Sequence, residues 1–384
     1  MTSYPQNIKY LNNNSTTNEF MNNLSFYNEE KYSFSRYKNA IKTGLENLGD
    51  TSYLNAVLFA LANIRNLSSF FLNPKNQNKI NKKIGELPFS YAYERLLIHL
   101  YPFPEKDKKE IYKPISLFNL LGYKNIIYKS FNRKNPNDLI CFILDILHNE
   151  LISKNNNQKF DGNIKDRNNM IKIGIKNFKN FNNSIISNNF NWFEIKESLC
   201  NKCGETTYNF QTFNSFSLDI EVTFNYYKNK VNNIKEILTI YDCLEFYNFT
   251  KQKNAYCNFC NQSLNKLNTT KIFSSPNIFI FLLDRGIDFD NKKLIDIHFN
   301  IDEKIDLKNY IENSEAPNKY GITGIVSINM KLKKYVSFCK SPVDKNWYLY
   351  NDEINEKADI KTILENHNNY KELIPCILIY EAII

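Results

Sequence analysis

Gly44-Leu45-Glu46-Asn47-Leu48-Gly49-Asp50-Thr51-Ser52-Tyr53-Leu54-Asn55 is a turn-rich stretch that passes directly into an apolar helical pattern. Asp50 and Thr51 both have side chains suited to cap the first turn of a helix. Apolar side chains then recur at the spacing of one helix face, at Leu54, Val57, Leu58, Leu61 and Ile64. A helix is therefore expected to start beside Ser52.

The remainder of the chain divides into a helical part followed by a strand-rich part. Helices are expected over 91–100 and 137–151, whereas the Asn-rich residues 153–190 are expected to loop out. After Phe193, β-branched or aromatic runs predict strands at 210–220, 277–283, 295–299, 320–328, 334–340, 347–350 and 376–380. This segregation predicts an α+β fold with an antiparallel sheet.

Two C-x-x-C motifs indicate a metal site. They read Cys200-Asn201-Lys202-Cys203 and Cys257-Asn258-Phe259-Cys260, and two thiolate pairs can complete a tetrahedral site for a structural Zn²⁺ ion. Two pairs of ordinary semi-buried thiols are an alternative, and so is a redox-active pair, although neither motif follows a strand in a thioredoxin-like pattern. The motifs lie too far apart for a compact zinc finger, so each is expected at the tip of a hairpin.

Composition indicates a globular protein in a reducing compartment. Of the 384 residues, 42% are hydrophobic and 15% aromatic, which excludes global disorder. No apolar run reaches the length of a membrane span, the first residues lack a signal-peptide pattern, and the eight cysteines do not form a disulfide framework. We therefore expect a cytoplasmic or nuclear protein with no membrane partner. Residues 1–40 have no apolar period and are expected to form a poorly ordered arm.

The net charge of +9 is unevenly distributed. Residues 272–384 contain 14 Lys and Arg against 17 Asp and Glu, whereas residues 1–271 contain 35 against 23. The basic excess lies in Asn- and Lys-rich stretches without the interleaved aromatic residues of a base-stacking surface. This pattern argues against nucleic acid as a partner.

Several motifs together resemble the ubiquitin-specific proteases. The 44–55 stretch is similar to their cysteine box, 137–145 to their acidic helix, and the cysteine pairs to their zinc-bearing fingers; the segments 335–338, 347–352 and 375–381 resemble the histidine box and last strand. The resemblance covers residues 43–384 in the family's order. It implies a papain-like thumb, palm and fingers, with a helical thumb over 43–190, a palm over 191–384 and zinc-tipped fingers around 196–271.

The catalytic positions depart from that family's pattern. The resemblance places Ser52 at the position of the nucleophilic cysteine, and Lys333-Lys334-Tyr335 at the Gly-His-Tyr motif, so that Lys334 takes the position of the general base. It also places Asn351 at the position that orients the histidine and Asn47 at the position that binds the oxyanion. Two of the three triad members are thus replaced.

The four histidines do not match the position of the base. His99 and His148 fall on expected helices, His298 in a strand outside the histidine box, and His367 in a polar loop beyond it. A helix N-terminus lowers a thiol pKa by stabilising the thiolate, but that effect is too small to activate a serine without a base. Ser-Lys pairs do act as catalysts in other proteins, which leaves Ser52 with Lys334 as an alternative.

We therefore expect a catalytically degenerate member of this family that binds ubiquitin or a scaffold partner. One alternative is an active deubiquitinase that uses the Ser-Lys pair or a base from outside the motif. A second alternative is a splicing or RNA-processing scaffold, as in other inactive relatives.

Overall fold

The computed structural model describes residues 39–80, 88–101, 110–152, 166–230, 236–249, 251–285, 295, 297–369 and 372–383. The expected N-terminal arm lies almost entirely outside the described residues. Among those residues, each helix is too short or too polar to span a bilayer.

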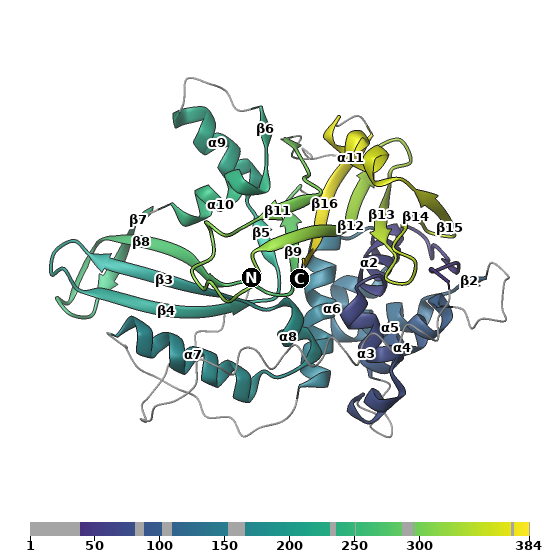
Figure 1. The fold of residues 1–384 in the computed structure, drawn as a ribbon, viewed down its shortest axis with the longest axis horizontal. Helices are drawn as coiled ribbons and strands as arrows, with labels where there is room; N and C mark the ends of the chain where they lie inside the picture. The colour runs from purple at the N-terminus through teal and green to yellow at the C-terminus, as the bar shows by residue number, and fades with distance from the viewer. Residues whose placement is uncertain are drawn as a thin grey trace.

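Helices α2 to α6 gather at one end of the molecule, in purple and blue in Figure 1. They are α2 (Ser52–Ala62), α3 (Arg65–Leu72), α4 (Phe89–Leu100), α5 (Ile115–Lys124) and α6 (Pro136–Leu151). Every residue of α2 is buried, because its side chains are apolar on nearly all sides. Two short strands, β1 (Gly44–Leu45) and β2 (Ile111–Tyr112), pair in parallel beside these helices. The three helices predicted from the sequence, α2, α4 and α6, are confirmed.

A large, mostly antiparallel sheet lies against α2 and α6. Its order is β15-β14-β13-β12-β16-β9-β5, with β11 paired to β12 and only the β5–β9 pairing parallel. The strands are β5 (Phe216–Leu218), β9 (Ile278–Leu283), β11 (Lys304–Asp306), β12 (Lys319–Asn329), β13 (Lys334–Lys340), β14 (Trp347–Asn351), β15 (Ile354–Ala358) and β16 (Leu373–Ala382). The α+β fold predicted from the sequence is confirmed.

Alternation along these strands produces two cores. Ile280, Val326 and Ile377 face the same core as α2, whereas Phe281 and Leu378 face a second core on the other side of the sheet. The second core is completed by α10 (Ile240–Asn248) and α11 (Ile360–Asn368). Helix α9 (Ile220–Lys230) also packs against the second core. The short strands β6 (Ile237–Leu238) and β10 (His298–Phe299) pair with each other beside it.

A second, four-stranded sheet extends away from helices α2 to α6, at the left of Figure 1. Its order is β4-β3-β8-β7, and the strands are β3 (Trp192–Cys200), β4 (Thr206–Phe213), β7 (Lys251–Cys257) and β8 (Gln262–Ser274). Both cysteine motifs lie in the turns at the tips of its two outer hairpins. The prediction that each motif lies at the tip of a hairpin is confirmed.

The expectation that residues 153–190 loop out was wrong from residue 167 onwards. This segment forms α7 (Arg167–Phe181) and α8 (Ile185–Phe190), whereas 153–165 lie outside the described residues. Asp166 caps α7 by accepting from two backbone N–H groups, and Met170 and Ile171 pack with Ile195 of β3. Burial of this apolar stripe outweighs the weak helix propensity of the asparagines.

Two further expectations are corrected by the structure. The strand expected over 210–220 is divided, because β4 ends at Phe213 and Ile220 already begins α9. His367 lies in the last turn of α11 and is fully buried, not in a polar loop. Asp359 caps α11, and Ile363 and His367 stand one turn apart on its buried face, a spacing of four that the sequence contains.

The turns of the hairpins share a backbone feature. Four non-glycine residues have positive φ in the described part of the chain: Asn261, Lys333, Lys345 and Asp352. Each lies between two paired strands, in the β7–β8, β12–β13, β13–β14 and β14–β15 connections respectively. Lys333, with a φ of +51°, occupies the position that the resemblance matches to a glycine, the residue best suited to such a conformation.

Candidate functional site

The loop that precedes α2 is organised by the Asn47 side chain. Its Oδ1 accepts from the N–H groups of Gly49 (3.2 Å) and Thr51 (3.0 Å) and from Thr51 Oγ1 (3.2 Å). Thr51 is the N-cap residue of α2, but its hydroxyl accepts from the N–H of Leu48 and does not cap the helix. The turn-rich loop over residues 47–51 is therefore held together by hydrogen bonds among its own residues.

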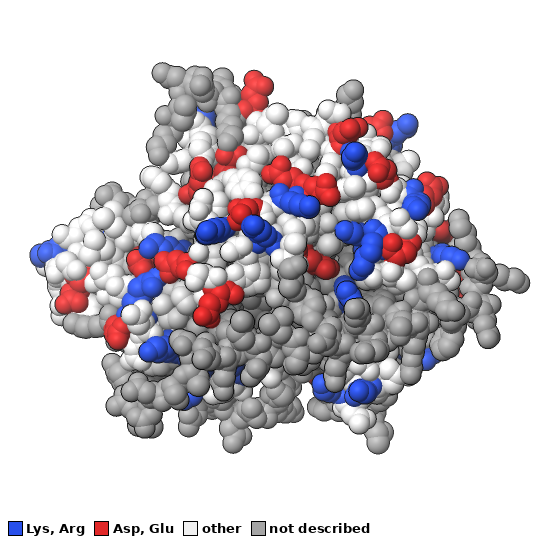
Figure 2. All heavy atoms as spheres, in the orientation of Figure 1, with Lys and Arg blue, Asp and Glu red and all other residues white. Residues whose placement is uncertain are grey.

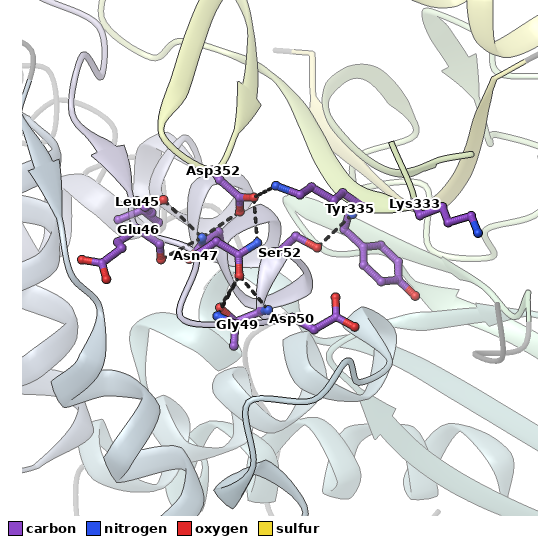
Figure 3. Close-up of polar contacts among 12 residues, drawn as sticks. Leu45, Glu46, Asn47, Gly49, Asp50, Ser52, Lys333, Tyr335 and Asp352 are labelled. Atoms are coloured by element: carbon purple, nitrogen blue, oxygen red, sulfur yellow. Dashed lines mark hydrogen bonds and ion pairs between the residues drawn. The ribbon is translucent and has the colours of Figure 1, made fainter. Parts of the chain in front are cut away.

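Ser52 is the first residue of α2 and is 0% exposed. Its Oγ accepts a hydrogen bond from the backbone N–H of Tyr335, at 3.1 Å, on the neighbouring strand β13 (Figure 3). The hydroxyl therefore serves a backbone amide 283 residues away in sequence. In this position it does not face solvent.

Asp352 connects the elements around the site and was not predicted from the sequence to be a site residue. Its Oδ1 accepts from Asn55 Nδ2 at 2.8 Å, and its Oδ2 accepts from Asn47 Nδ2 at 2.9 Å and from Lys334 Nζ at 3.1 Å (Figure 3). Its side chain is only 6% exposed, whereas that of Lys334 is 43% exposed. The only sequence signal is an acidic residue directly after Asn351 at a strand end.

Asn351, the residue predicted to orient a base, is the last residue of β14. Its Oδ1 is buried and has no hydrogen-bond partner in the described structure. The Lys334 ammonium bonds to Asp352 instead. Of the four predicted site residues, Asn47 and Lys334 thus both bond to Asp352. Ser52 bonds to β13, the strand that carries Lys334, and Asn351 lies on the neighbouring strand β14.

None of the four histidines, all of which the structure describes, bonds to the Ser52 hydroxyl. His99 Nδ1 bonds to the carbonyl of Arg95, and His148 Nδ1 bonds to the hydroxyl of Ser184. His367 Nε2 lies 2.7 Å from Ser327 Oγ, and burial lowers the pKa of its imidazole to about 4.

His298 lies on β10, the strand at the outer end of the second core, so the strand expected for it is confirmed. The helices expected for His99 and His148 are also confirmed, as α4 and α6. The histidines are therefore spread over separate elements, none of which is β13 or the loop before α2.

The cysteine motifs form a second candidate site at the tip of the four-stranded sheet. The four Sγ atoms of Cys200, Cys203, Cys257 and Cys260 lie within 4.8 Å of one another. The Cys200–Cys260 and Cys203–Cys257 pairs are 3.9 and 3.7 Å apart. Thiolates around a tetrahedral zinc ion lie about 3.8 Å apart, because each Zn–S bond is about 2.3 Å long. This donor set can therefore hold a zinc ion.

Backbone hydrogen bonds lower the pKa of one thiol in each motif, Cys200 and Cys257, whereas desolvation and the neighbouring thiols raise the pKa of Cys203 and Cys260. Hydrogen bonds from the backbone N–H groups of Cys260 and Phe259 lower the pKa of the Cys257 thiol to about 6. The tight turn of the second motif supplies both donors.

A family model described as ubiquitin carboxyl-terminal hydrolase matches residues 43–380. The chain belongs to this family. Among curated members, the hydrolase Usp2 of Drosophila melanogaster is 23% identical over 332 residues, covering 84% of this chain and 33% of its own length. Hydrolase 4 of Saccharomyces cerevisiae is 24% identical over 372 residues, covering 85% of this chain and 38% of its own length. This hydrolase-family chain thus spans about a third of the length of these relatives.

Solved structures of the SAGA deubiquitinase module show the same fold. The module of a Ubp8 variant with Sgf11, Sus1 and Sgf73 bound to monoubiquitin matches with a TM-score of 0.65 at 17% identity, over 96% of this chain and 76% of that one. The module bound to ubiquitin aldehyde matches with a TM-score of 0.64 at 18% identity, over 96% of this chain and 77% of that one. The thumb, palm and fingers architecture predicted from the sequence is confirmed for this family member.

Proposed function

We propose that this chain is a catalytically degenerate ubiquitin-specific protease that binds ubiquitin, or a protein partner, without cleaving it. The observation that carries the proposal is Ser52, which stands at the nucleophile position, is fully buried and accepts from the Tyr335 backbone. A nucleophile must reach its substrate and pass a proton to a base. Within the described structure, Ser52 has no histidine to accept that proton.

The surroundings of Lys334 support the same conclusion. In a Ser-Lys mechanism the lysine must be neutral when it acts as the base. Here the Lys334 ammonium donates to the Asp352 carboxylate at 3.1 Å, whereas the Ser52 hydroxyl bonds to the Tyr335 backbone, so the described structure shows no Ser52–Lys334 bond. Asn47, at the oxyanion position, donates its amide to Asp352 as well. Asn47 and Lys334 thus both bond to the Asp352 carboxylate.

Ubiquitin is the partner that the family membership favours. One structural neighbour is bound to monoubiquitin in a module with three further proteins, so we propose that this chain binds ubiquitin or a protein scaffold. On the face drawn in Figure 2, basic and acidic side chains are interspersed, which does not favour a nucleic-acid partner. A role as a splicing or RNA-processing scaffold remains the weaker alternative.

The remaining parts of the proposal concern organisation and metal. We propose a helical thumb over 43–190, a palm over 191–384 with fingers around 196–271, and an N-terminal arm over 1–40. Cys200, Cys203, Cys257 and Cys260 would hold a structural Zn²⁺ ion at the fingertips, where it fixes the two hairpins to each other. We place the protein in the cytoplasm or the nucleus, where thiols stay reduced.

One experiment separates the alternatives. Fluorescently labelled ubiquitin is titrated against the purified chain, and hydrolysis of a fluorogenic ubiquitin substrate is followed with the same preparation. We expect binding without turnover. Turnover that disappears in Ser52→Ala would overturn the inactive assignment, and its loss in Lys334→Met as well would establish the Ser-Lys mechanism. Absence of ubiquitin binding would favour a different protein partner.

A further inference from the structure

Arg133 bridges the loop before α2 and the start of β13. It belongs to the segment that leads into α6, and its guanidinium donates to Asp50 Oδ1 from Nε at 3.3 Å and from Nη2 at 3.2 Å. Nη2 also donates to the backbone carbonyl of Lys333 at 3.1 Å. One side chain thus connects the helical part of the molecule to the large eight-stranded sheet, called the palm sheet below, 200 residues away in sequence.

The contact lies immediately beside the nucleophile position. Asp50 precedes Ser52 by two residues, and Lys333 precedes Tyr335 by two residues, so the Arg133 bridge and the Ser52–Tyr335 bond are successive links between the same two segments. Figure 3 shows Asp50, Ser52, Lys333 and Tyr335 in this neighbourhood. The carbonyl of Lys333 and the N–H of Tyr335 are therefore both bonded within the chain.

These two backbone groups are what an extended peptide would need. β13 lies between β12 and β14 but pairs with β14 only from Ser337 onwards, so a strand-like segment that approaches Ser52 can hydrogen-bond to main-chain groups at the start of β13. Buried backbone groups must keep partners, so an incoming peptide has to replace the present ones. The Ser52 hydroxyl is buried, but the Arg133 side chain is 19% exposed and its partner Asp50 is 45% exposed. Arg133 is thus the link that a peptide can displace first.

We infer that Arg133 is an internal clasp that occupies the Lys333 carbonyl and competes with the extended C-terminal tail of ubiquitin for the start of β13. The inference rests on the proposed binding of ubiquitin. A partly exposed ion pair is weak, so the clasp can open without unfolding the site. Removal of the clasp is expected to expose position 52 and to strengthen tail binding.

The clasp is tested first without ubiquitin. In a Ser52→Cys background, alkylation of residue 52 by iodoacetamide is followed by peptide mass spectrometry, with the half-buried Cys141 as an internal reference. We expect Arg133→Ala to accelerate the reaction at residue 52 about fivefold, the effect of losing one partly exposed ion pair. Asp50→Ala removes the other half of the pair and should act in the same direction. Lys129→Ala, which removes an exposed cation from the same segment, is the matched control.

Binding of ubiquitin is the second readout. Arg133→Ala should bind intact ubiquitin about fivefold more tightly than the unmodified chain, for the same reason. This gain should vanish with ubiquitin that lacks its C-terminal tail. Equal alkylation rates with and without Arg133, or an equal acceleration by Lys129→Ala, would refute the clasp. If neither form binds ubiquitin, the proposed function fails, while the alkylation rates still decide whether Arg133 restricts access to residue 52.

Discussion

Gly44 lies so close to Glu353 that a Cβ atom placed on it would be 2.5 Å from the Glu353 carbonyl oxygen. The neighbouring contact joins Leu45 N–H to the carbonyl of Asp352 at 2.9 Å. Gly44→Ala should therefore separate β1 from the β14–β15 turn, because backbone atoms cannot rotate away as a side chain can. We expect a loss of about 1–3 kcal/mol in the free energy of unfolding, measured by urea denaturation.

Gly321 provides the matched control for that substitution. It lies in β12, and an added Cβ would be 3.7 Å from the nearest Ile383 side-chain atom, which is an ordinary contact. Gly321→Ala should change stability by less than Gly44→Ala does. Equal effects of the two substitutions would show that the approach of Gly44 to Glu353 does not constrain this turn.

The four-cysteine cluster should carry one zinc ion per chain. Cys260→Ser removes one ligand, so zinc content measured by elemental analysis should fall from one per chain to nearly zero. Hydrogen exchange should then accelerate in β7 and β8, because the fingertip loses its cross-link. Cys141→Ser, outside the cluster, should leave both measurements unchanged. Reduced, folded protein that contains no zinc would contradict the assignment.

Restoring catalysis should require two substitutions. Ser52→Cys alone supplies a thiol at the start of a helix, yet no imidazole in the described structure accepts its proton, so the fluorogenic substrate should remain intact. Lys334→His in addition would place an imidazole beside Asn351, whose buried Oδ1 lacks a partner among the described residues and can orient it. General acid-base catalysis contributes about 10²–10⁴-fold, so the double variant should exceed the single one by at least about 100-fold.

The matched control for this pair is Ser52→Ala with Lys334→His, which has the imidazole but no thiol. If the double variant binds ubiquitin yet stays inert, the geometry of the site has changed beyond the two reacting groups. Rapid cleavage by Ser52→Cys alone would reveal a base that neither sequence nor structure has identified.

His367 should make stability pH-dependent between about pH 6.5 and 4. Its pKa is about 4 when folded and about 6.5 when unfolded, so the unfolded chain binds the proton more readily in this window. Stability from this group is complete above about pH 6.5 and falls by about 3 kcal/mol as the pH drops to about 4. Urea denaturation of His367→Gln should show a smaller decline than the unmodified chain. Parallel declines would exclude this role for His367.

The elements that were predicted correctly are those with a local signal. Two cysteines at a spacing of three define each motif whatever surrounds them, and the apolar face of α6 repeats along the length of the helix. In α7 the signal was present but weak, since only a narrow apolar stripe interrupts the asparagines and lysines. Its structure depends on packing against the four-stranded sheet β4-β3-β8-β7, and most of that sheet lies far from α7 in sequence.

The candidate site was predictable only as a set of positions. Motif order identified Asn47, Ser52, Lys334 and Asn351, but the carboxylate that joins two of them belongs to Asp352. Its contacts to Asn47 and Asn55 span 305 and 297 residues, and neither periodicity nor spacing encodes them. The Arg133 bridge could not be predicted from the sequence either. One of its partners is the Lys333 carbonyl, and every residue carries such a carbonyl.

Three hairpin turns of the palm sheet contain a residue whose backbone conformation lowers the stability of the protein. A side chain in the left-handed region costs about 1–2 kcal/mol, and three consecutive connections of the palm sheet contain such a residue at Lys333, Lys345 and Asp352. Glycine at 333 would remove that cost while retaining the turn. At the other two turns glycine would lose side-chain contacts, because Lys345 Nζ donates to the Pro342 carbonyl at 3.0 Å and the Asp352 carboxylate accepts three hydrogen bonds. Of these three turns, the one at Lys333 is therefore the place where a single substitution should raise the thermal stability of the sheet.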